Sequence, residues 1–156
     1  MKLDINGLLD SAQSLADVYT GCNKVAVGSM LIVEGKMRIY GQNKSIPDCR
    51  ELGCRRIELY GEDSKNHRLP SDCRSLHSEI KVITEAAKMG VSTSGATLIV
   101  TRYPCEACAR AIVNAGIKKV YYGRKQEISE ETEKIFKSGN VEFLHVRNWT
   151  YNDTER

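Results

Sequence analysis

The chain has 156 residues, of which 41% are hydrophobic and 28% are charged. This composition suits a single domain over 1–156 that can bury a continuous core. The net charge of +3 is far below the basic excess that broad nucleic-acid binding needs. No apolar stretch approaches the roughly 20 residues of a membrane span, and residues 1–4 lack the basic-then-apolar order of a secretory signal. We therefore predict a cytoplasmic protein with no polynucleotide or membrane partner.

The first third of the chain predicts one helix followed by a hairpin. Apolar residues recur at helical spacing over 6–19, and Gly21 is expected to end this helix. Two β-rich runs, 25–33 and 37–41, are separated by three residues with a central glycine, which is typical of an antiparallel hairpin. Residues 44–72 show no period, so we predict an irregular segment. Loops longer than about 15 residues generally have a function or are held by an additional cross-link.

The second half alternates between helical and extended patterns. The predicted elements are a helix over 75–88, a strand over 96–101, a helix over 105–115, a strand over 119–122, a helix over 129–137 capped by Ser129, and a strand over 141–146. Strands joined by single helices are normally parallel. We therefore expect an α/β fold with a five-stranded mixed sheet flanked by helices. Residues 147–156 are predicted to form a polar, partly mobile tail.

The number and positions of the cysteines are the first indication of a metal-binding or catalytic site. The six cysteines are Cys22, Cys49, Cys54, Cys73, Cys105 and Cys108. Thiols stay reduced in the cytosol, where a cluster of them more often indicates metal binding or catalysis than disulfides. A secreted disulfide scaffold is the alternative, but such scaffolds are short and poor in regular helices and strands. A bound metal ion is therefore the candidate for what holds residues 44–72 in place.

Two short motifs predict a catalytic metal site. Residues 77–79 (His-Ser-Glu) and 104–108 (Pro-Cys-Glu-Ala-Cys) each fall at the start of a predicted helix. Together they match the His-x-Glu and Pro-Cys-x-x-Cys signature of zinc deaminases that act on nucleobases. One imidazole and two thiolates supply three protein ligands and leave the fourth position of a catalytic zinc open. We therefore predict that His77, Cys105 and Cys108 bind zinc, with two helix N-termini favouring the thiolates.

Glu79 is the predicted proton carrier. It lies two residues from His77 in the same first turn, so it reaches a zinc-bound water without binding the metal. Zinc lowers the pKa of such a water toward about 7, and a glutamate can pass its protons to a ring nitrogen and to departing ammonia. The predicted reaction is hydrolytic deamination. A redox Cys-x-x-Cys pair is the alternative, but such a pair follows an early strand and has no His-x-Glu partner.

The sequence resembles the cytidine deaminase superfamily, and within it the deoxycytidylate (dCMP) deaminase family, over about residues 15–146. Residues 22–28 resemble that family's cysteine, basic residue and Val-Gly segment, and 115–120 resemble its Ala-Gly-Ile-basic-basic run. Residues 41–44 (Gly-Gln-Asn-Lys) resemble its Gly-Tyr-Asn-Gly turn. The resemblance implies a three-layer fold, conversion of free dCMP to dUMP and ammonia, a homo-oligomer and, in some members, assistance by Mg²⁺.

The resemblance also implies a second zinc without a catalytic role. Its ligands in the family are a cysteine ahead of the first strand and side chains ahead of the His-x-Glu helix. Cys22, Cys49, Cys54 and Cys73 occupy those places, and the spacing of Cys49 and Cys54 falls in the range of structural zinc ligands. A zinc ion bound there would hold residues 44–74 beside the substrate pocket. The alternative is four reduced cysteines that act as small hydrophobes.

The predicted substrate-binding residues are Asn43, Lys24 and Tyr103. Asn43 is carried over from the family turn as a partner for a sugar hydroxyl, whereas Gln42 and Lys44 depart from that turn and leave dCTP regulation unsupported. Residues 44–74 hold seven basic and six acidic side chains, so no basic stripe suits a polynucleotide and a mononucleotide is favoured.

Other functions stay open at this point. Deamination of adenosine in tRNA or of free cytidine would use the same motifs. A zinc-stabilised binding module without activity would use only the ligands. Glu79 speaks against the module, because a purely structural site gains nothing from an acid beside an open zinc position.

Overall fold

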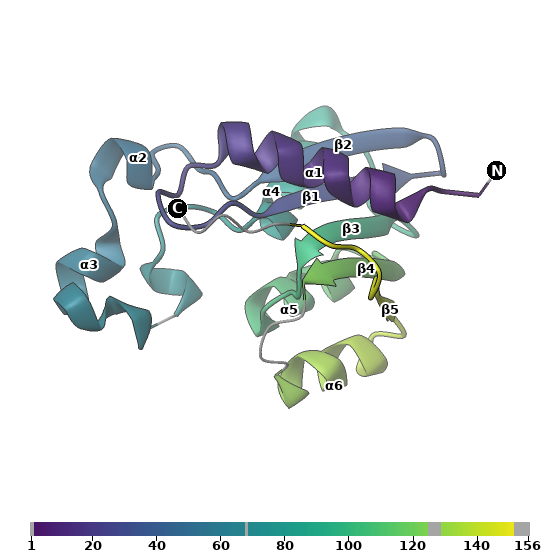
Figure 1. Cartoon of the computed structure of the whole chain (residues 1–156). Helices are drawn as coiled ribbons and strands as arrows, with labels where there is room; N and C mark the ends of the chain where they lie inside the picture. Colours follow the sequence, from purple (N-terminus) through teal and green to yellow (C-terminus); the bar gives the residue numbers. More distant parts are fainter. Residues whose placement is uncertain (1, 68, 125–128, 152–156) are drawn as a thin grey trace.

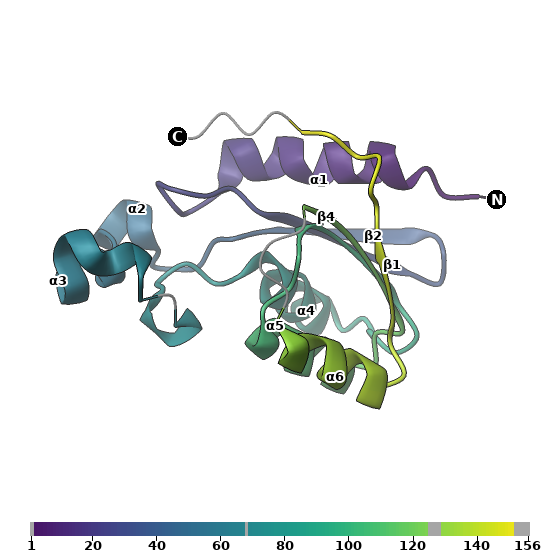
Figure 2. The same ribbon diagram turned by 60° about the horizontal axis from the view of Figure 1, so that its bottom comes forward.

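A three-layer α/β architecture is seen in the computed structural model, which describes residues 2–67, 69–124 and 129–151. One five-stranded sheet has α1 on one face and α4, α5 and α6 on the other (Figures 1 and 2). The elements of these layers are α1 (Ile5–Tyr19), β1 (Gly28–Val33), β2 (Met37–Gln42), α4 (Ser78–Met89), β3 (Thr97–Arg102), α5 (Glu106–Asn114), β4 (Lys119–Arg124), α6 (Glu130–Ser138) and β5 (Glu142–His145). The predicted fold class and the order of these elements are confirmed.

The sheet is mixed, with the strand order β2-β1-β3-β4-β5. β1 runs antiparallel to both β2 and β3, whereas β3, β4 and β5 run parallel. Ser29 of β1 lies opposite Gly41 of β2 on one side and opposite Val100 of β3 on the other. The predicted hairpin and the parallel half of the sheet are thus both present.

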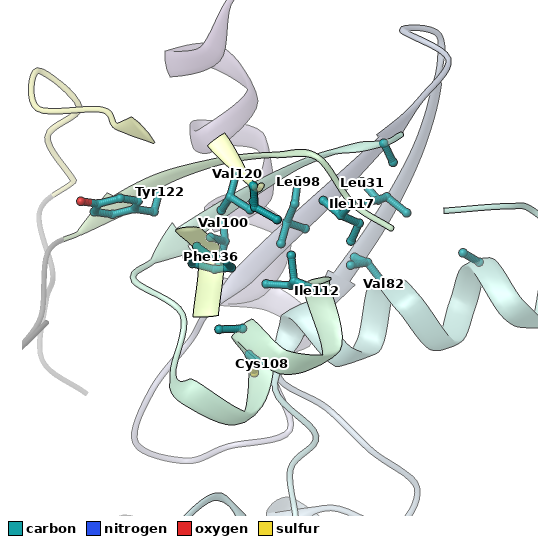
Figure 3. Packing of buried hydrophobic residues seen from close by; sticks show 14 of the residues in the cluster. Leu31, Val82, Leu98, Val100, Cys108, Ile112, Ile117, Val120, Tyr122 and Phe136 are labelled. Atoms are coloured by element: carbon teal, nitrogen blue, oxygen red, sulfur yellow. The ribbon is translucent and has the colours of Figure 1, made fainter. Parts of the chain in front are cut away.

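Both faces of the sheet are buried. Leu98, Ile112 and Phe136 are fully buried in the core between the sheet and helices α4 to α6 (Figure 3). Met30 and Leu9 belong to the core beneath α1. Full burial of a side chain of this size contributes about 1.5–3 kcal/mol. Strands covered on both faces read as continuous apolar runs, which is why β1 and β3 are recognisable in the sequence.

Several helix ends follow from side-chain and glycine chemistry. α1 begins after Asp4, whose carboxylate accepts a hydrogen bond from the backbone of Gly7 at 3.2 Å. α4 ends at Gly90, which adopts the left-handed conformation with φ 66°. Ser129 precedes α6 as predicted but does not cap it, because its hydroxyl donates to Glu106 Oε1 at 2.5 Å.

Residues 45–74 form a projection that we call the arm, which extends from one end of the molecule in both views (Figures 1 and 2). The prediction of an irregular segment is wrong, because the arm contains four short helices. These are α2 (Cys49–Leu52), α3 (Arg55–Tyr60) and the 3₁₀-helices η1 (Gly61–Lys65) and η2 (Pro70–Asp72). Helices of three to six residues are too short to produce a recognisable hydrophobic period.

Polar contacts hold the arm together. The Arg74 guanidinium donates to both carboxylate oxygens of Glu58 at 2.7 and 2.8 Å. Tyr60 donates to Asp72 at 3.0 Å. The backbone N–H of Arg50 donates to the carbonyl of Gly21 at 3.2 Å, which joins the arm to the segment after α1.

The predicted polar tail also needs correction over residues 147–151. Trp149 is buried in the core beneath α1, and its Nε1 donates to Asp10 at 2.8 Å. Its ring lies against Gly123, where a Cβ would stand 2.3 Å from the ring. Trp149 is therefore packed, whereas Arg147, Asn148 and Thr150 are exposed as predicted, and residues 152–156 lie outside the described chain. No helix among the described residues has both the length and the apolar character to cross a membrane.

Candidate metal centre and active site

Three predicted metal ligands converge at one point. His77 is the N-cap residue of α4, Cys105 is the N-cap residue of α5, and Cys108 lies in the first turn of α5. His77 Nδ1 is 3.6 Å from Cys105 Sγ and 3.4 Å from Cys108 Sγ. Over the described ranges this is the only set of three or more His, Cys, Asp or Glu side chains whose ligand atoms all lie within 4.8 Å of one another.

The spacing of these atoms fits a tetrahedral zinc. Zinc–nitrogen and zinc–sulfur bonds of about 2.0 and 2.3 Å at a tetrahedral angle place the nitrogen and sulfur about 3.5 Å apart. The two measured nitrogen–sulfur distances, 3.4 and 3.6 Å, match that value. One imidazole and two thiols are also the donor types that zinc prefers. Three protein ligands leave a fourth position for water or substrate.

The fold brings these ligands together because two helices start at the same edge of the sheet. The carbonyls of His77 and Cys105 accept the first hydrogen bonds of α4 and α5, from Lys81 at 2.9 Å and Ala109 at 2.8 Å. The N–H groups of each first turn have no partner within their own helix. They place partial positive charge at the cluster, and that charge favours thiolates.

Hydrogen bonds within the cluster shift the protonation of all three ligands. The bond from Cys108, together with that from His77, lowers the pKa of Cys105 to about 4. The same Cys105–Cys108 bond and burial raise the pKa of Cys108. The bond to Cys105 raises the pKa of His77. Metal binding requires a deprotonated thiolate and a neutral imidazole, so it competes with protons at these ligands.

Glu79 lies in the first turn of α4 and is 4% exposed. Burial raises the pKa of its carboxyl group, and the positive charge of His77 opposes that shift. The negative charge of Glu79 in turn raises the pKa of Cys108, as expected for a carboxylate that faces the sulfur ligands. Its Oε2 accepts a hydrogen bond from Ser78 at 3.2 Å. The carboxylate thus lies beside the metal ligands, as the His-x-Glu spacing predicts.

Asn43 organises the chain next to the site. Its Oδ1 accepts hydrogen bonds from the Val27 backbone at 2.9 Å and from the Thr20 hydroxyl at 2.8 Å. Its Nδ2 donates to the carbonyl of Val25 at 2.8 Å. The side chain is 7% exposed. Asn43 therefore fixes the loop between α1 and β1, a structural role that its sequence motif does not predict.

The other two predicted substrate residues lie in different surroundings. Lys24 is exposed, and its Nζ is 3.5 Å from the hydroxyl of Ser64 in the arm. Tyr103 is buried, and its ring meets the ring of Tyr122 edge-on at 4.9 Å. Burial raises the pKa of Tyr103 to about 12. Its hydroxyl has no hydrogen-bond partner within residues 2–67, 69–124 and 129–151.

The remaining four cysteines do not converge as the first three do. All four are free, and no three of their sulfurs lie within 4.8 Å of one another. They nevertheless occupy adjoining segments, since burial and the neighbouring Cys49 and Cys22 raise the pKa of Cys73. Cys54 begins α3, whose Glu58 binds Arg74 next to Cys73.

A small cavity of about 150 Å³ adjoins the metal ligands. His77 and Cys108 line it on one side, and Ser45, Cys73 and Arg74 line it on the side of the arm. A larger surface hollow of about 650 Å³ lies between the start of α1 and β5 and contains none of the predicted site residues. The arm therefore forms one wall of the site.

The chain belongs to the family described as the cytidine and deoxycytidylate deaminase zinc-binding region, whose model matches residues 4–124. It is 32% identical over 134 residues to ComE operon protein 2 of Bacillus subtilis, covering 83% of this chain and 65% of that protein. It is also 32% identical over 131 residues to the deoxycytidylate deaminase of Enterobacteria phage T2, covering 81% of this chain and 69% of that enzyme. The chain thus spans about two thirds of the length of these relatives.

The fold is also seen in a solved structure. The dCMP deaminase of cyanophage S-TIM5, in complex with dCMP and dUMP, superposes with a TM-score of 0.68 at 23% identity. The match covers 93% of this chain and 98% of that one. This likeness confirms the predicted deaminase-like arrangement of sheet and helices.

Proposed function

We propose that this protein is a zinc-dependent hydrolytic deaminase of a free pyrimidine nucleotide, and that it converts dCMP to dUMP and ammonia. The observation that carries the proposal is the convergence of His77, Cys105 and Cys108 beside the buried carboxylate of Glu79. Family membership supports the reaction class, and the phage T2 relative supports the substrate.

His77, Cys105 and Cys108 would hold the zinc, which when bound makes a water molecule nucleophilic at neutral pH. Glu79 would accept a proton from that water and deliver it to the pyrimidine ring nitrogen, and would then pass the remaining proton of the added oxygen to the departing amine. A carbon–oxygen bond forms, the carbon–nitrogen bond to the exocyclic amine breaks, and ammonia leaves. Glu79 is 4% exposed, and this burial would limit exchange of its proton with bulk water during these steps.

We propose three substrate contacts at the edge of the site. The remaining hydrogen-bonding capacity of the Asn43 amide suits a sugar hydroxyl. The exposed ammonium of Lys24, between the α1–β1 loop and the arm, suits a 5′-phosphate. Tyr103 precedes Pro104 and Cys105 in the chain and would help shape the pocket around the base.

The substrate assay distinguishes the candidate functions. Purified, zinc-replete protein is incubated with dCMP, CMP, dCTP, deoxycytidine or tRNA, with and without Mg²⁺, and ammonia release is recorded. We expect the fastest turnover with dCMP, and any gain with Mg²⁺ would establish the predicted assistance. Failure to deaminate any pyrimidine would defeat the proposal, and inosine formation in tRNA would favour an adenosine deaminase.

We also propose that Cys22, Cys49, Cys54 and Cys73 bind a second, structural zinc. The adjoining positions of Cys22, Cys49 and Cys73 support this, and none of the four cysteines forms a disulfide. Four thiolates form the closed ligand set of a structural zinc and need a reducing location such as the cytoplasm. Metal analysis is expected to give two zinc ions per chain, and one ion would favour four reduced thiols without metal.

A homo-oligomer is our remaining proposal for this chain. Five large apolar side chains of the arm are exposed, namely Ile46, Leu52, Ile57, Leu59 and Leu69. Exposed apolar groups of this kind are common at sites of protein association. Sedimentation velocity at several concentrations is expected to show a species larger than 17.5 kDa.

A further inference from the structure

We propose that Ser29 and Ser78 form a hydrogen-bonded relay that positions the carboxylate of Glu79. The inference rests on the proposed deaminase function and deepens it. Ser29 lies in β1, Ser78 is the first residue of α4, and both are fully buried. Their hydroxyl oxygens are 2.7 Å apart, and Ser78 Oγ is 3.2 Å from Glu79 Oε2.

The direction of the two hydrogen bonds follows from the number of protons. A serine hydroxyl has one proton, and a carboxylate can only accept. Ser78 must therefore give its proton to Glu79 Oε2, which leaves Ser29 as the donor in the 2.7 Å bond between the two hydroxyls. The chain of donors points from the sheet to the carboxylate. Successive hydrogen bonds polarise one another in a buried setting, so Ser29 strengthens the bond that Ser78 makes.

Close packing of α4 on the sheet makes the relay feasible. Ser29 lies directly opposite Gly41 of the neighbouring strand β2. A Cβ added at Gly41 would stand 2.7 Å from Val82 Cγ1 and 3.0 Å from the carbonyl oxygen of Ser78. Two small residues side by side thus admit the first turn of α4, and the Ser78 hydroxyl comes within reach of the strand.

The relay adds to the orientation that the first turn of α4 provides, where the backbone N–H of Glu79 also bonds the carboxylate. A glutamate side chain has three rotatable bonds and loses much freedom when it is held in one rotamer. With Oε2 bound to Ser78, Oε1 is left to exchange protons with the reacting groups. The serine therefore acts through Glu79 and is a positioning residue. Loss of the bond is expected to slow the proton transfers and to leave nucleotide binding unchanged.

The test compares Ser78→Ala, Ser29→Ala and the double variant with the wild type. A hydrogen bond to a charged group is typically worth a factor of about 10 to 100, so we expect kcat of Ser78→Ala to fall by about that factor, with KM unchanged. Ser29→Ala is expected to lose about threefold to tenfold. In the double variant the two effects should not multiply, because Ser29 acts only through Ser78. Zinc content should stay at the wild-type value in all three.

Crystal structures of the same variants give a readout that does not depend on turnover. Glu79 is expected to leave its wild-type rotamer in Ser78→Ala. The control Thr132→Val removes another fully buried hydroxyl, in α6, and should keep both kcat and the Glu79 rotamer. Wild-type kcat in Ser78→Ala, fully multiplicative losses or an unmoved Glu79 would each overturn the relay. Absence of turnover in the wild type would defeat the proposed function instead, and the Glu79 rotamer would still decide the relay.

Discussion

The sheet with its covering helices and the arm are stabilised in different ways. The sheet lies between two cores of fully buried side chains such as Leu98 and Met30. The arm buries few apolar groups and exposes several large ones, and it is held by ion pairs and hydrogen bonds. Hydrophobic burial can therefore hold the sheet and its helices, whereas the arm depends more on polar contacts, to which the proposed second zinc would add.

The two regions also contribute different parts of the site. The metal ligands and Glu79 stand on helices that are anchored in the core, so their geometry is set by the stable part of the chain. The arm supplies the opposite wall of the cavity through Ser45, Cys73 and Arg74. We expect the chemistry to depend on the first region and access of the substrate to depend on the second.

The largest expected effect is on the core. Ile112→Ala removes a fully buried side chain between α5 and the sheet and is expected to lower the free energy of unfolding by about 2–5 kcal/mol. Urea unfolding followed by circular dichroism measures this loss. The metal site should melt in the same transition, because both of its helices pack on this core. A loss below about 1 kcal/mol would show that the core is not what fixes the site.

Metal removal should affect the arm more than the core. Incubation with a strong chelator is expected to speed proteolysis at least about tenfold, with cleavage confined to residues 45–74. The far-UV circular dichroism of the sheet and large helices should persist. Mass spectrometry of the fragments locates the cleavage. Cuts spread evenly over the chain would contradict the division between the two regions.

A smaller effect is expected from the ion pair of Arg74 and Glu58. The hydrogen bond from Arg74 lowers the pKa of Glu58, so the pair stabilises the arm above the unfolded pKa of 4.5 and is lost as pH falls through the lowered value. In metal-free protein, hydrogen exchange in α3 should therefore speed up over that acidic range. Glu58→Gln should exchange at the faster rate at neutral pH and respond less to acid. Equal pH responses in the two proteins would rule out this role of the pair.

The smallest effect is expected at the exposed apolar residues of the arm. Leu59→Ser changes a side chain that is 48% exposed, so the free energy of unfolding should change by less than about 0.5 kcal/mol. Sedimentation is the informative measurement here. If the arm takes part in the proposed oligomer, Leu59→Ser should shift the protein toward the monomer, with Glu51→Gln, also on the exposed surface of the arm, as the control.

The sequence predicts the sheet and the large helices well. Amphipathic helices repeat apolar residues at helical spacing, and strands buried on both faces are continuous apolar runs. It also predicts the ligand trio, since His77, Cys105 and Cys108 have the spacing of a known metal signature at two helix starts. Both features depend on local pattern, which a single sequence contains. The bounds of the strands and large helices are correct to within about three residues.

The features that the sequence does not predict depend on contacts between distant segments. The link from Ser29 to Ser78 joins positions 49 residues apart, and neither serine stands out in its own surroundings. The burial of Trp149 depends on Gly123, which is distant in sequence and leaves room for its ring. The helices of the arm are too short for a period, and the polar contacts of Asn43 with the α1–β1 loop follow from tertiary packing.

The most direct test of the central claim is the deamination rate of Glu79→Gln. This variant keeps the size of the side chain and removes its ability to carry protons. We expect wild-type zinc content and a loss of about 10² to 10⁴ in kcat on the preferred pyrimidine nucleotide. Turnover at the wild-type rate by the zinc-loaded variant would contradict the assignment of Glu79 as the proton carrier.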